Sequence, residues 1–379
     1  MLNIGITGQS GFIGTHLFNK LMLYQNRFSI IPFRDEYFES TLGLERFVSE
    51  CDVIIHLAAL NRHADAEVLY KTNLKLIQSL ISALETTKSK PHVIFSSSIQ
   101  EEVDNKYGAS KKAGRQLLSE WARQQNANFS GLLLPNVFGP FGAPFYNSVV
   151  ASFCFQLTHG ETPKIDVDAD LKLIYIDELV DYIVQVIDSR IGKISNNPSQ
   201  ITKKVQHTTE KKVSDILALL IGFVEKYMVK GHLPNLKDSY VRNMFNTFVC
   251  FIDHDKYYPF KLTKHSDARG SFVEILKLSS GGQVSFSTTA PGVTRGDHYH
   301  TRKVERFAVI NGQARIELRR IGTTNKQSFL VDGDQPSFID MPIWHTHNIT
   351  NVGADELFTI FWINEYFDSD DPDTYFEKV

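Results

Sequence analysis

The pattern of apolar residues changes near residue 250, and this change constrains the fold more than any other feature of the sequence. Up to about residue 190, short apolar runs alternate with longer stretches of helical period, which is typical of parallel strands joined by crossover helices. After Phe251, short alternating strands are separated by glycine-rich turns, which indicates an antiparallel barrel or sandwich. The sequence therefore predicts an α/β domain of Rossmann type over residues 1–245 and an all-β barrel domain over residues 246–379.

The expected elements follow from the same patterns. Strands are expected in the first domain at 2–7, 29–33, 53–57, 92–96 and 131–134, and in the second at 271–278, 283–288, 305–310, 314–320 and 357–362. Residues 192–212 lack periodicity and carry two lysine pairs, so they are predicted to be a solvated connection. Val213 to Met228 has apolar residues at helical spacing and is expected to form an amphipathic helix that closes the first domain.

Composition limits the kinds of partner. The 379 residues carry 40 Lys and Arg against 43 Asp and Glu, without a long block of one sign, so no nucleic-acid surface is expected. Three widely spaced cysteines without a CxxC pair favour a reducing compartment. No segment resembles a signal peptide, and the apolar stretches are shorter than the ~20 residues that cross a bilayer. We therefore expect a cytoplasmic protein that acts on a small molecule and not at a membrane.

A glycine-rich turn follows the first expected strand. Gly8, Gly11 and Gly14 stand between that strand and a helix, where glycines let the backbone approach a pyrophosphate and the helix N-terminus adds partial positive charge. The same triplet also occurs in simple turns, but its position at the first strand-to-helix junction predicts a dinucleotide site. Twenty residues beyond Gly14, Arg34 occupies the place where NAD-specific enzymes carry an acidic residue. This favours NADPH, although Asp35 lies beside it.

A second group of residues indicates carbonyl reduction. Tyr107 and Lys111 are four residues apart and would share one helix face, where the ammonium is expected to lower the pKa of the phenol from about 10. Ser98, at the end of a strand, supplies a hydroxyl for the same carbonyl oxygen. Taken alone, such a Tyr and Lys pair is usually helix surface. Together with the glycines, the three residues predict a reductase.

These motifs resemble the extended short-chain dehydrogenase/reductase family over roughly residues 1–245. The resemblance also rests on Asp52 to Ala59, on Asn73 and on Pro135 to Pro140. It implies that Tyr107 protonates the substrate oxygen and that Asn136 faces the nucleotide sugar. It further implies a cofactor site formed by Gly8, Gly11, Phe12, Ile13, Gly14, Arg34, Leu57, Ala58, Ala59, Tyr107 and Lys111.

Two departures from that family narrow the expected reaction. The interval from Ser98 to Tyr107 is only nine residues, much shorter than in the epimerases and dehydratases of the family, so the substrate lid must be trimmed. No Asp-Glu or Asp-Lys pair follows Ser98, as the resemblance would require of a 4,6-dehydratase. Simple ketone reduction is the chemistry that remains.

The second domain carries the spacing of the first cupin motif, from Gly292 to Gly312, and a looser second motif from Pro342 to Asn351. In an antiparallel barrel, alternate histidines point to one face and further ligands arrive from neighbouring strands. Three imidazoles and a carboxylate suit zinc, iron, manganese or nickel, and zinc is favoured. The expected ligands are His298, His300, Glu305 and His347. His345 is a rival to His347 because Trp344 replaces the expected glycine, and the alternative is that some of these are core histidines.

Two further segments resemble the nucleotide-sugar 3,5-epimerase branch of the cupins, namely residues 265–274 and 295–299. The resemblance implies that His298 is the catalytic base, which conflicts with a role as metal ligand. If His298 binds metal, the base is expected among Tyr299, Lys303 and His345. The acidic stretch Asp368 to Asp373 is interpreted as a solvated tail. The substrate contacts implied by this resemblance are Arg269, Phe272, Glu274 and Arg295.

The pairing of the two domains resembles the bifunctional capsular polysaccharide enzymes of bacteria. The resemblance implies that the cupin epimerises C3 of a UDP-2-acetamido-2,6-dideoxy-4-keto-hexose. The reductase then reduces C4 with NADPH, giving UDP-N-acetyl-6-deoxy-L-talosamine for the N-acetyl-L-fucosamine of capsule or O-antigen. Epimerisation comes first, because the C3 proton is acidic only beside the ketone.

Three alternative functions stay open at this point. One is a reductase with a structural or binding cupin, the second is an NADP-responsive regulator, and the third is an epimerase with a vestigial reductase. A homodimer or tetramer is expected for each of them.

Overall fold

The computed structural model describes residues 1–189, 199–267, 270–273, 275, 277–278, 282–365 and 367–379. The chain divides into two compact units. The first unit comprises Met1–Val149 and Asp168–Val213, and the second comprises Val150–Val167 and Ser214–Val379. The helical segments after residue 213 therefore belong to the second unit by their contacts. The domain limit at residue 245 stays a prediction.

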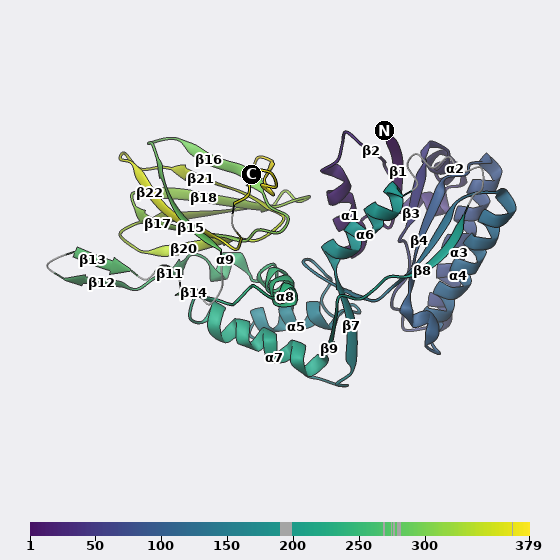
Figure 1. The fold of residues 1–379 in the computed structure, drawn as a ribbon, viewed down its shortest axis with the longest axis horizontal. Coiled ribbons are helices and arrows are strands. Elements are labelled where there is room, and N and C mark those ends of the chain that lie inside the picture. The colour runs from purple at the N-terminus through teal and green to yellow at the C-terminus, as the bar shows by residue number, and fades with distance from the viewer. Residues whose placement is uncertain (190–198, 268–269, 274, 276, 279–281, 366) are drawn as a thin grey trace. The chain divides into compact units, whose positions relative to one another are not determined.

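The first unit is built on a six-stranded parallel sheet with the order β2-β1-β3-β4-β5-β8 (Figure 1). The order runs outward from β1 in both directions, which is the doubly wound arrangement that places ligands at the carboxyl ends of the strands. This confirms the predicted α/β fold. The strands are β1 (Leu2–Thr7), β2 (Phe28–Ile31), β3 (Val53–His56), β4 (His92–Ser98), β5 (Phe129–Leu134) and β8 (Gln200–Lys204).

Helices cover both faces of this sheet because its strands are apolar on both sides. In Figure 1, α1 and α6 lie on one face and α2, α3 and α4 lie on the other. A three-stranded sheet of β6 (Asn136–Phe138), β7 (Asp170–Tyr175) and β9 (Thr209–Lys212) completes the unit. The helices are α1 (Phe12–Met22), α2 (Thr41–Glu50), α3 (Ala66–Thr87), α4 (Lys106–Gln125) and α6 (Ile176–Asp188), and the short 3₁₀ turns are η1 (Asp35–Glu39) and η2 (Ile99–Glu102).

The predicted connection over residues 192–212 is wrong where the structure describes it. β8 is the edge strand of the parallel sheet and pairs with β5 from Phe129 to Leu133, and β9 pairs with β7. Residues 192–198 lie outside the described part of the chain. The lysines of β8 are exposed, as expected, because an edge strand needs few buried side chains.

The second unit contains two five-stranded antiparallel sheets that pack face to face (Figure 1), which confirms the predicted all-β architecture. Their shared core includes Ala308, Ile316, Ile339 and Ile349, drawn from both sheets. The first sheet has the order β11 (Phe260–Lys261), β20 (Ser337–Met341), β17 (Glu305–Asn311), β22 (Leu357–Ile363) and β15 (Gln283–Thr289). The second has the order β19 (Lys326–Asp332), β18 (Gln313–Arg320), β21 (His345–Asn351), β16 (Thr294–Tyr299) and β23 (Tyr375–Phe376).

Smaller elements of the second unit surround this sandwich. A hairpin of β12 (Lys264–Asp267) and β13 (Gly270–Val273) extends from it, and β10 (His232–Leu233) pairs with β14 (Lys277–Leu278). The helices are α5 (Val149–Thr158), α7 (Val213–Phe223), α8 (Ser239–Val249) and α9 (His254–Tyr257). The predicted helix 213–228 is confirmed, and its last turn, η3 (Val224–Met228), widens to a π-helix. None of the described helices is long and apolar enough to cross a bilayer.

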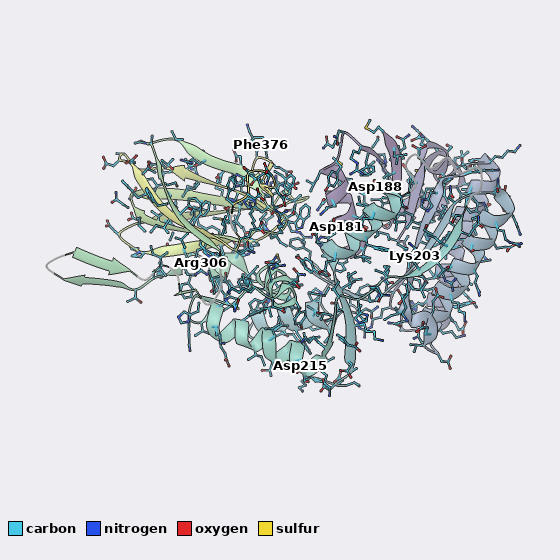
Figure 2. All side chains as sticks on the ribbon, viewed as in Figure 1. Asp181, Asp188, Lys203, Asp215, Arg306 and Phe376 are labelled. Atoms are coloured by element: carbon cyan, nitrogen blue, oxygen red, sulfur yellow. The ribbon has the colours of Figure 1, made fainter. Side chains whose placement is uncertain are left out.

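A buried ion pair fixes η3 to the sandwich. Arg306, labelled in Figure 2, donates to both carboxylate oxygens of Asp340 at 2.7 and 3.0 Å. It also donates to the carbonyl of Gly231 at 3.0 Å. Tyr227 on η3 donates to the same carboxylate. Both charges are thus paired and hydrogen-bonded, which is what burial of an ion pair requires.

Candidate functional site

The turn after β1 is shaped by two glycines. Gly8 has φ +70°, and a Cβ there would lie 2.8 Å from the backbone nitrogen of Ala58. A Cβ on Gly14 would lie 2.2 Å from the carbonyl oxygen of Gly8. Gly11 is the N-cap residue of α1, and it has no side chain that could accept hydrogen bonds from the first N–H groups of the helix. The turn therefore brings bare backbone to a helix N-terminus, which fits a dinucleotide pyrophosphate.

The loop after β3 lies against this turn. The backbone nitrogens of Leu57 and Ala58 donate to the carbonyl and hydroxyl oxygens of Thr7 at 3.1 and 3.3 Å. The Thr7 hydroxyl also contacts Nδ1 of His56 at 2.8 Å, and burial lowers the pKa of His56 to about 3. A neutral His56 thus helps to hold residues 57–59 beside the glycine turn, where the sequence predicted the cofactor.

Arg34 lies three residues after β2 and directly before η1, with an exposed side chain. It lines a surface pocket together with Asp35, Glu36, Tyr37 and Ser40. The pocket thus combines one guanidinium with two carboxylates. The preference for NADPH stays a prediction.

The predicted Ser, Tyr and Lys set lies at the ends of β4 and α4. Ser98 ends β4, and α4 begins just before Tyr107, where the Asn105 side chain accepts from the third N–H of the helix at 2.7 Å. Lys111 Nζ donates to the carbonyl of Ser96 at 3.0 Å and lies 5.8 Å from the ring centroid of Tyr107. The structure therefore brings the helix face of Tyr107 and Lys111 to the strand end of Ser98.

The pKa of Tyr107 moves opposite to the expected direction. Burial raises it to about 12 and lowers the pKa of Lys111 to about 8. Burial of the phenol is the cause, and the Lys111 ammonium donates to the Ser96 carbonyl. Tyr107 is therefore protonated at neutral pH, which is the form that a proton donor needs.

The short interval between Ser98 and Tyr107 folds as η2 against α4. A Cβ on Gly108 would lie 2.0 Å from the carbonyl oxygen of Gln100, so only glycine allows this approach. Glu101 on η2 receives hydrogen bonds from Arg115 of α4 at 2.9 and 2.6 Å. Hydrogen bonds from Arg115 and Ser97 lower the pKa of Glu101 although burial opposes this. The trimmed interval is thus held by an ion pair.

Two further sets of polar contacts were not predicted from the sequence. The Asn73 side chain bonds both backbone groups of Leu60, at 2.7 and 3.0 Å, and donates to the Ser110 hydroxyl at 3.0 Å, which joins the loop after β3 to α4. The Glu101 and Arg115 pair was also missed. Its signal was the place of Arg115 one helical turn after Lys111, on the same helix face.

The predicted substrate residues are mostly exposed or outside the described part of the chain. Asn136 is exposed on β6 and donates to the carbonyl of Lys172 at 3.3 Å. Arg295 is exposed on β16 and donates to the carbonyl of Thr288 at 3.2 Å. Phe272 belongs to β13. Arg269 and Glu274 lie outside the described residues.

The predicted metal ligands come together in the sandwich. One ligand atom from each of four residues lies within 4.8 Å of the others, and we name this set the quartet: His298, His300, Glu305 and His347. His298 on β16 pairs directly with His347 on the neighbouring strand β21. Glu305 begins β17 in the facing sheet, so the expectation that it arrives from a neighbouring strand is wrong. The carboxylate reaches the imidazoles across the core.

Two imidazoles of the quartet have fixed orientations. Nδ1 of His300 bonds the carbonyl of Asp373, and Nδ1 of His347 bonds the carbonyl of His345 at 3.1 Å. A carbonyl only accepts, so both Nδ1 atoms carry the hydrogen and each Nε2 faces Glu305. Nε2 of His347 and of His300 lie 2.9 and 3.3 Å from Glu305 Oε2.

The charges of the quartet fit a cation. The three buried atoms just named make no hydrogen bond of good geometry within the described residues. Burial would raise the pKa of Glu305, but the imidazoles of His300 and His347 lower it well below its usual range. Burial and the neighbouring imidazoles lower the pKa of His298 to about 4. An anionic carboxylate among imidazole nitrogens is a ligand set for zinc or a similar divalent ion, with carbonyls orienting the rings.

His345, the rival ligand, lies outside the quartet. Its Nδ1 contacts the carbonyl of Ile343 at 3.0 Å, and its ring centroid lies 5.4 Å from that of His254. Trp344, which replaces the expected glycine, has φ +57° and stacks on Tyr299. The left-handed turn is therefore kept without glycine, and His347 occupies the ligand position.

Models of two protein families match the chain. Residues 4–196 match the NAD dependent epimerase/dehydratase family, and residues 265–375 match the polysaccharide biosynthesis C-terminal domain. The chain belongs to the NAD dependent epimerase/dehydratase family. The second match covers the sandwich with the quartet, so this family member carries an added C-terminal domain.

Two relatives of this family member cover both parts, and a third covers a shorter segment. It is 34% identical to UDP-2-acetamido-2,6-beta-L-arabino-hexul-4-ose reductase of Pseudomonas aeruginosa PA103, over 99% of this chain and 98% of the relative. The structure of the capsular polysaccharide assembling protein CapF from Staphylococcus aureus matches with TM-score 0.62 and 31% identity, over 100% of both chains. Spore coat polysaccharide biosynthesis protein SpsL of Bacillus subtilis 168 is 29% identical over 123 residues, 30% of this chain and 82% of SpsL. The predicted two-part family is confirmed.

The predicted solvated tail is wrong at its last residue. Asp368, Asp370 and Asp371 are exposed, but Asp373 is only 2% exposed. Its carboxylate accepts from the hydroxyl of Thr301 and from backbone N–H groups of residues 301–303. These donors replace water, which is why an acidic residue is stable in a buried place.

Proposed function

We propose that this protein is a bifunctional nucleotide-sugar enzyme of capsule or O-antigen synthesis. Its barrel epimerises C3 of a UDP-2-acetamido-2,6-dideoxy-4-keto-hexose, and its first unit reduces the C4 ketone with NADPH to UDP-N-acetyl-6-deoxy-L-talosamine. The observation that carries the proposal is that one chain holds a Ser, Tyr and Lys set, a glycine turn that fits a dinucleotide, and a ligand quartet of which three members are buried. The names of the full-length relatives, a 4-ulose reductase and a capsular protein, support the substrate class.

In the reductase site, the chain supplies the proton and the alignment. The glycine turn would hold the pyrophosphate of NADPH and Arg34 its 2′-phosphate, and the bound cofactor would supply the hydride. Tyr107 holds its proton at neutral pH and delivers it to the C4 oxygen, while Ser98 donates a hydrogen bond to the same oxygen. Lys111, fixed by the Ser96 carbonyl, orients the nicotinamide ribose, and Asn136 faces the sugar.

In the barrel, the quartet holds a divalent cation, with zinc as the favoured ion. When bound there, such a cation would supply Lewis-acid stabilisation of the negative charge on a ketone oxygen whose neighbouring carbon loses a proton. His298 serves as a ligand in this arrangement, so the base is one of Tyr299, Lys303 and His345. Arg269, Phe272, Glu274 and Arg295 contact the nucleotide sugar.

We further propose the domain limits, the cellular location and the oligomeric state that the sequence predicts. The reductase domain spans residues 1–245 and the cupin domain spans residues 246–379. The protein acts in the cytoplasm as a homodimer or tetramer.

The proposal is tested by incubating the protein with a 4-keto UDP-N-acetyl-6-deoxyhexose in deuterated buffer, first without and then with NADPH. Deuterium at C3 before NADPH is added, followed by a reduced product, is the expected result by NMR. Reduction without deuterium at C3 would indicate a reductase whose second unit has only a binding or structural role. Exchange without NADPH oxidation would leave an epimerase with a vestigial reductase.

A further inference from the structure

One residue far along the chain contacts both the quartet and the loop between two of its members. The carbonyl of Asp373 accepts the hydrogen bond from Nδ1 of His300. Its carboxylate accepts from the Thr301 backbone at 3.1 Å and hydroxyl at 2.6 Å, from the Arg302 backbone at 3.0 Å and from the Lys303 backbone at 3.2 Å. Residues 301–304 form the whole connection from His300 to Glu305.

The contacts of the Asp373 side chain require a carboxylate. All four partners donate, so the group at this place must accept through two oxygens. An amide would turn an NH₂ group toward N–H donors and leave some of them unpaired in a buried place. Asp373 also has φ +40°, a left-handed conformation that Asp and Asn adopt more readily than most residues. An Asn variant therefore changes the acceptor and keeps the backbone preference.

The segment around Asp373 is itself held against the quartet strands. β23 pairs with β16, with Phe376 opposite His298. The backbone nitrogen of Glu377 donates to the carbonyl of Asp297 at 2.9 Å, and its carboxylate accepts from Arg319 at 2.7 Å. Asp373 thus lies two residues before a paired strand rather than on a free end.

We propose that Asp373 is a positioning residue for the metal quartet. Its carbonyl fixes the ring orientation of His300, so that Nε2 faces the cation, and its carboxylate sets the path of residues 301–304, which places Glu305 opposite. Groups that orient metal ligands in this way typically change metal affinity by about 10–100-fold when they are removed. The inference rests on the proposed metal site and adds a residue that the sequence placed in a solvated tail.

The test measures zinc affinity of the full-length protein by competition with a chromophoric chelator, for the wild type, Asp373→Asn and Asp371→Asn. Asp371 is the matched control, because its carboxylate is exposed and pairs with the Arg302 guanidinium at 2.7 Å. Asp373→Asn is expected to weaken zinc binding about 10–100-fold, and Asp371→Asn is expected to change it less than about twofold.

A second readout separates positioning from simple loss of stability. Each protein is melted with EDTA and with zinc, because a bound ion raises the melting temperature according to its affinity. A residue that only stabilises the fold would lower both temperatures equally, whereas a positioning residue lowers the rise that zinc produces. Thr301→Val removes the hydroxyl donor and keeps the backbone hydrogen bonds to Asp373. It is expected to reduce zinc affinity and the zinc-induced rise in melting temperature by less than Asp373→Asn does. It replaces Asp373→Asn in the test if that variant does not fold.

The outcomes are distinct. A wild-type protein that binds no divalent ion would overturn the proposed metal site and this inference with it. Wild-type protein that binds zinc, together with Asp373→Asn and Thr301→Val proteins that bind it equally well, would overturn the positioning role of the Asp373 carboxylate and leave the metal site in place.

Discussion

The reductase site and the quartet differ in how far most of their polar groups are exposed, although Lys111 is buried and His298 is half-buried. Ser98 and Tyr107 are half-buried and Asn136 is exposed, at the open carboxyl edge of a parallel sheet. In the quartet, His300 is 4% exposed and His347 is 1% exposed, between two packed sheets. One site is built at an edge, and the other is built in a core.

The difference in exposure corresponds to the kind of ligand expected at each site. A dinucleotide and a nucleotide sugar must enter and leave, so the reductase side chains are fixed from behind, as Lys111 is by the Ser96 carbonyl. A resident ion is small, so its ligands can face one another in the interior, as His347 and Glu305 do at 2.9 Å. Substitutions should therefore cost reaction rate in the first site and metal binding in the second.

The largest expected effect separates the two sites. Tyr107→Phe removes the proton donor and is expected to slow NADPH-dependent reduction by about 10²–10⁴-fold. The same variant should bind zinc with unchanged affinity and should still exchange the C3 proton. Steady-state NADPH oxidation with the 4-keto sugar measures the first effect, and NMR in deuterated buffer measures the second. Reduction at the wild-type rate would break the assignment of Tyr107 as the proton donor, whereas a Tyr107→Phe protein that lost reduction but kept full biological activity would revive a regulatory role.

The reverse experiment removes the one carboxylate of the quartet. Glu305→Gln is expected to weaken zinc binding by about 100-fold or more and to abolish C3 exchange, because the only anionic ligand is lost. NADPH affinity, measured by fluorescence titration, should not change. Glu356→Gln is the control, since Glu356 is exposed in the same unit. Zinc bound as tightly by Glu305→Gln as by the wild type would contradict the ligand assignment.

A pH effect is expected from the buried histidine of the reductase unit. The pKa of His56 is about 3 in the folded protein, below the ordinary 6.5, because burial disfavours the charged form. The unfolded chain therefore binds the proton more readily, and stability is lost as the pH falls below 6.5 toward 3. Between pH 6.5 and 5 the loss is about 2 kcal/mol. Urea unfolding of wild type and His56→Asn at both pH values checks it, and an equal pH dependence would refute the assignment.

The smallest effect concerns the choice of cofactor. Arg34→Ala is expected to weaken NADPH binding about tenfold and to leave NADH binding unchanged, because the guanidinium is expected to meet only the 2′-phosphate. Isothermal titration with both cofactors measures this difference. Arg46→Ala is the control, since Arg46 is exposed on α2 and pairs with Glu50. Equal losses for NADPH and NADH would place Arg34 elsewhere in the site.

The sequence predicted those parts of the fold that depend on apolar periodicity. β1 was predicted at its observed limits, because a buried parallel strand is a continuous apolar run. β8 was missed because it lies at the edge of the sheet, where Lys203 and Lys204 stay in water and no apolar pattern is needed. Edge strands are specified by their backbone partner, which the local sequence does not contain.

The candidate sites likewise divide into residues that a local sequence pattern predicts and residues whose contacts come from distant parts of the chain. His298 and His300 were predicted because alternation along a strand is a local property. The burial of Asp373 was missed because it depends on donors 70 to 72 residues away, at Thr301 to Lys303. The raised pKa of Tyr107 was missed for a related reason, since it depends on burial of the phenol in the folded protein.

The contact between His300 and Asp373 also bears on the order in which the protein matures. It spans 73 residues, whereas the parallel sheet is complete once β8, which ends at Lys204, has been synthesised. Domains generally fold as they emerge from the ribosome. A nascent chain can therefore carry a finished dinucleotide fold while its second unit still lacks the residue that orients His300. The orientation of His300 that the proposed metal site requires can therefore be completed only after Asp373 has been synthesised.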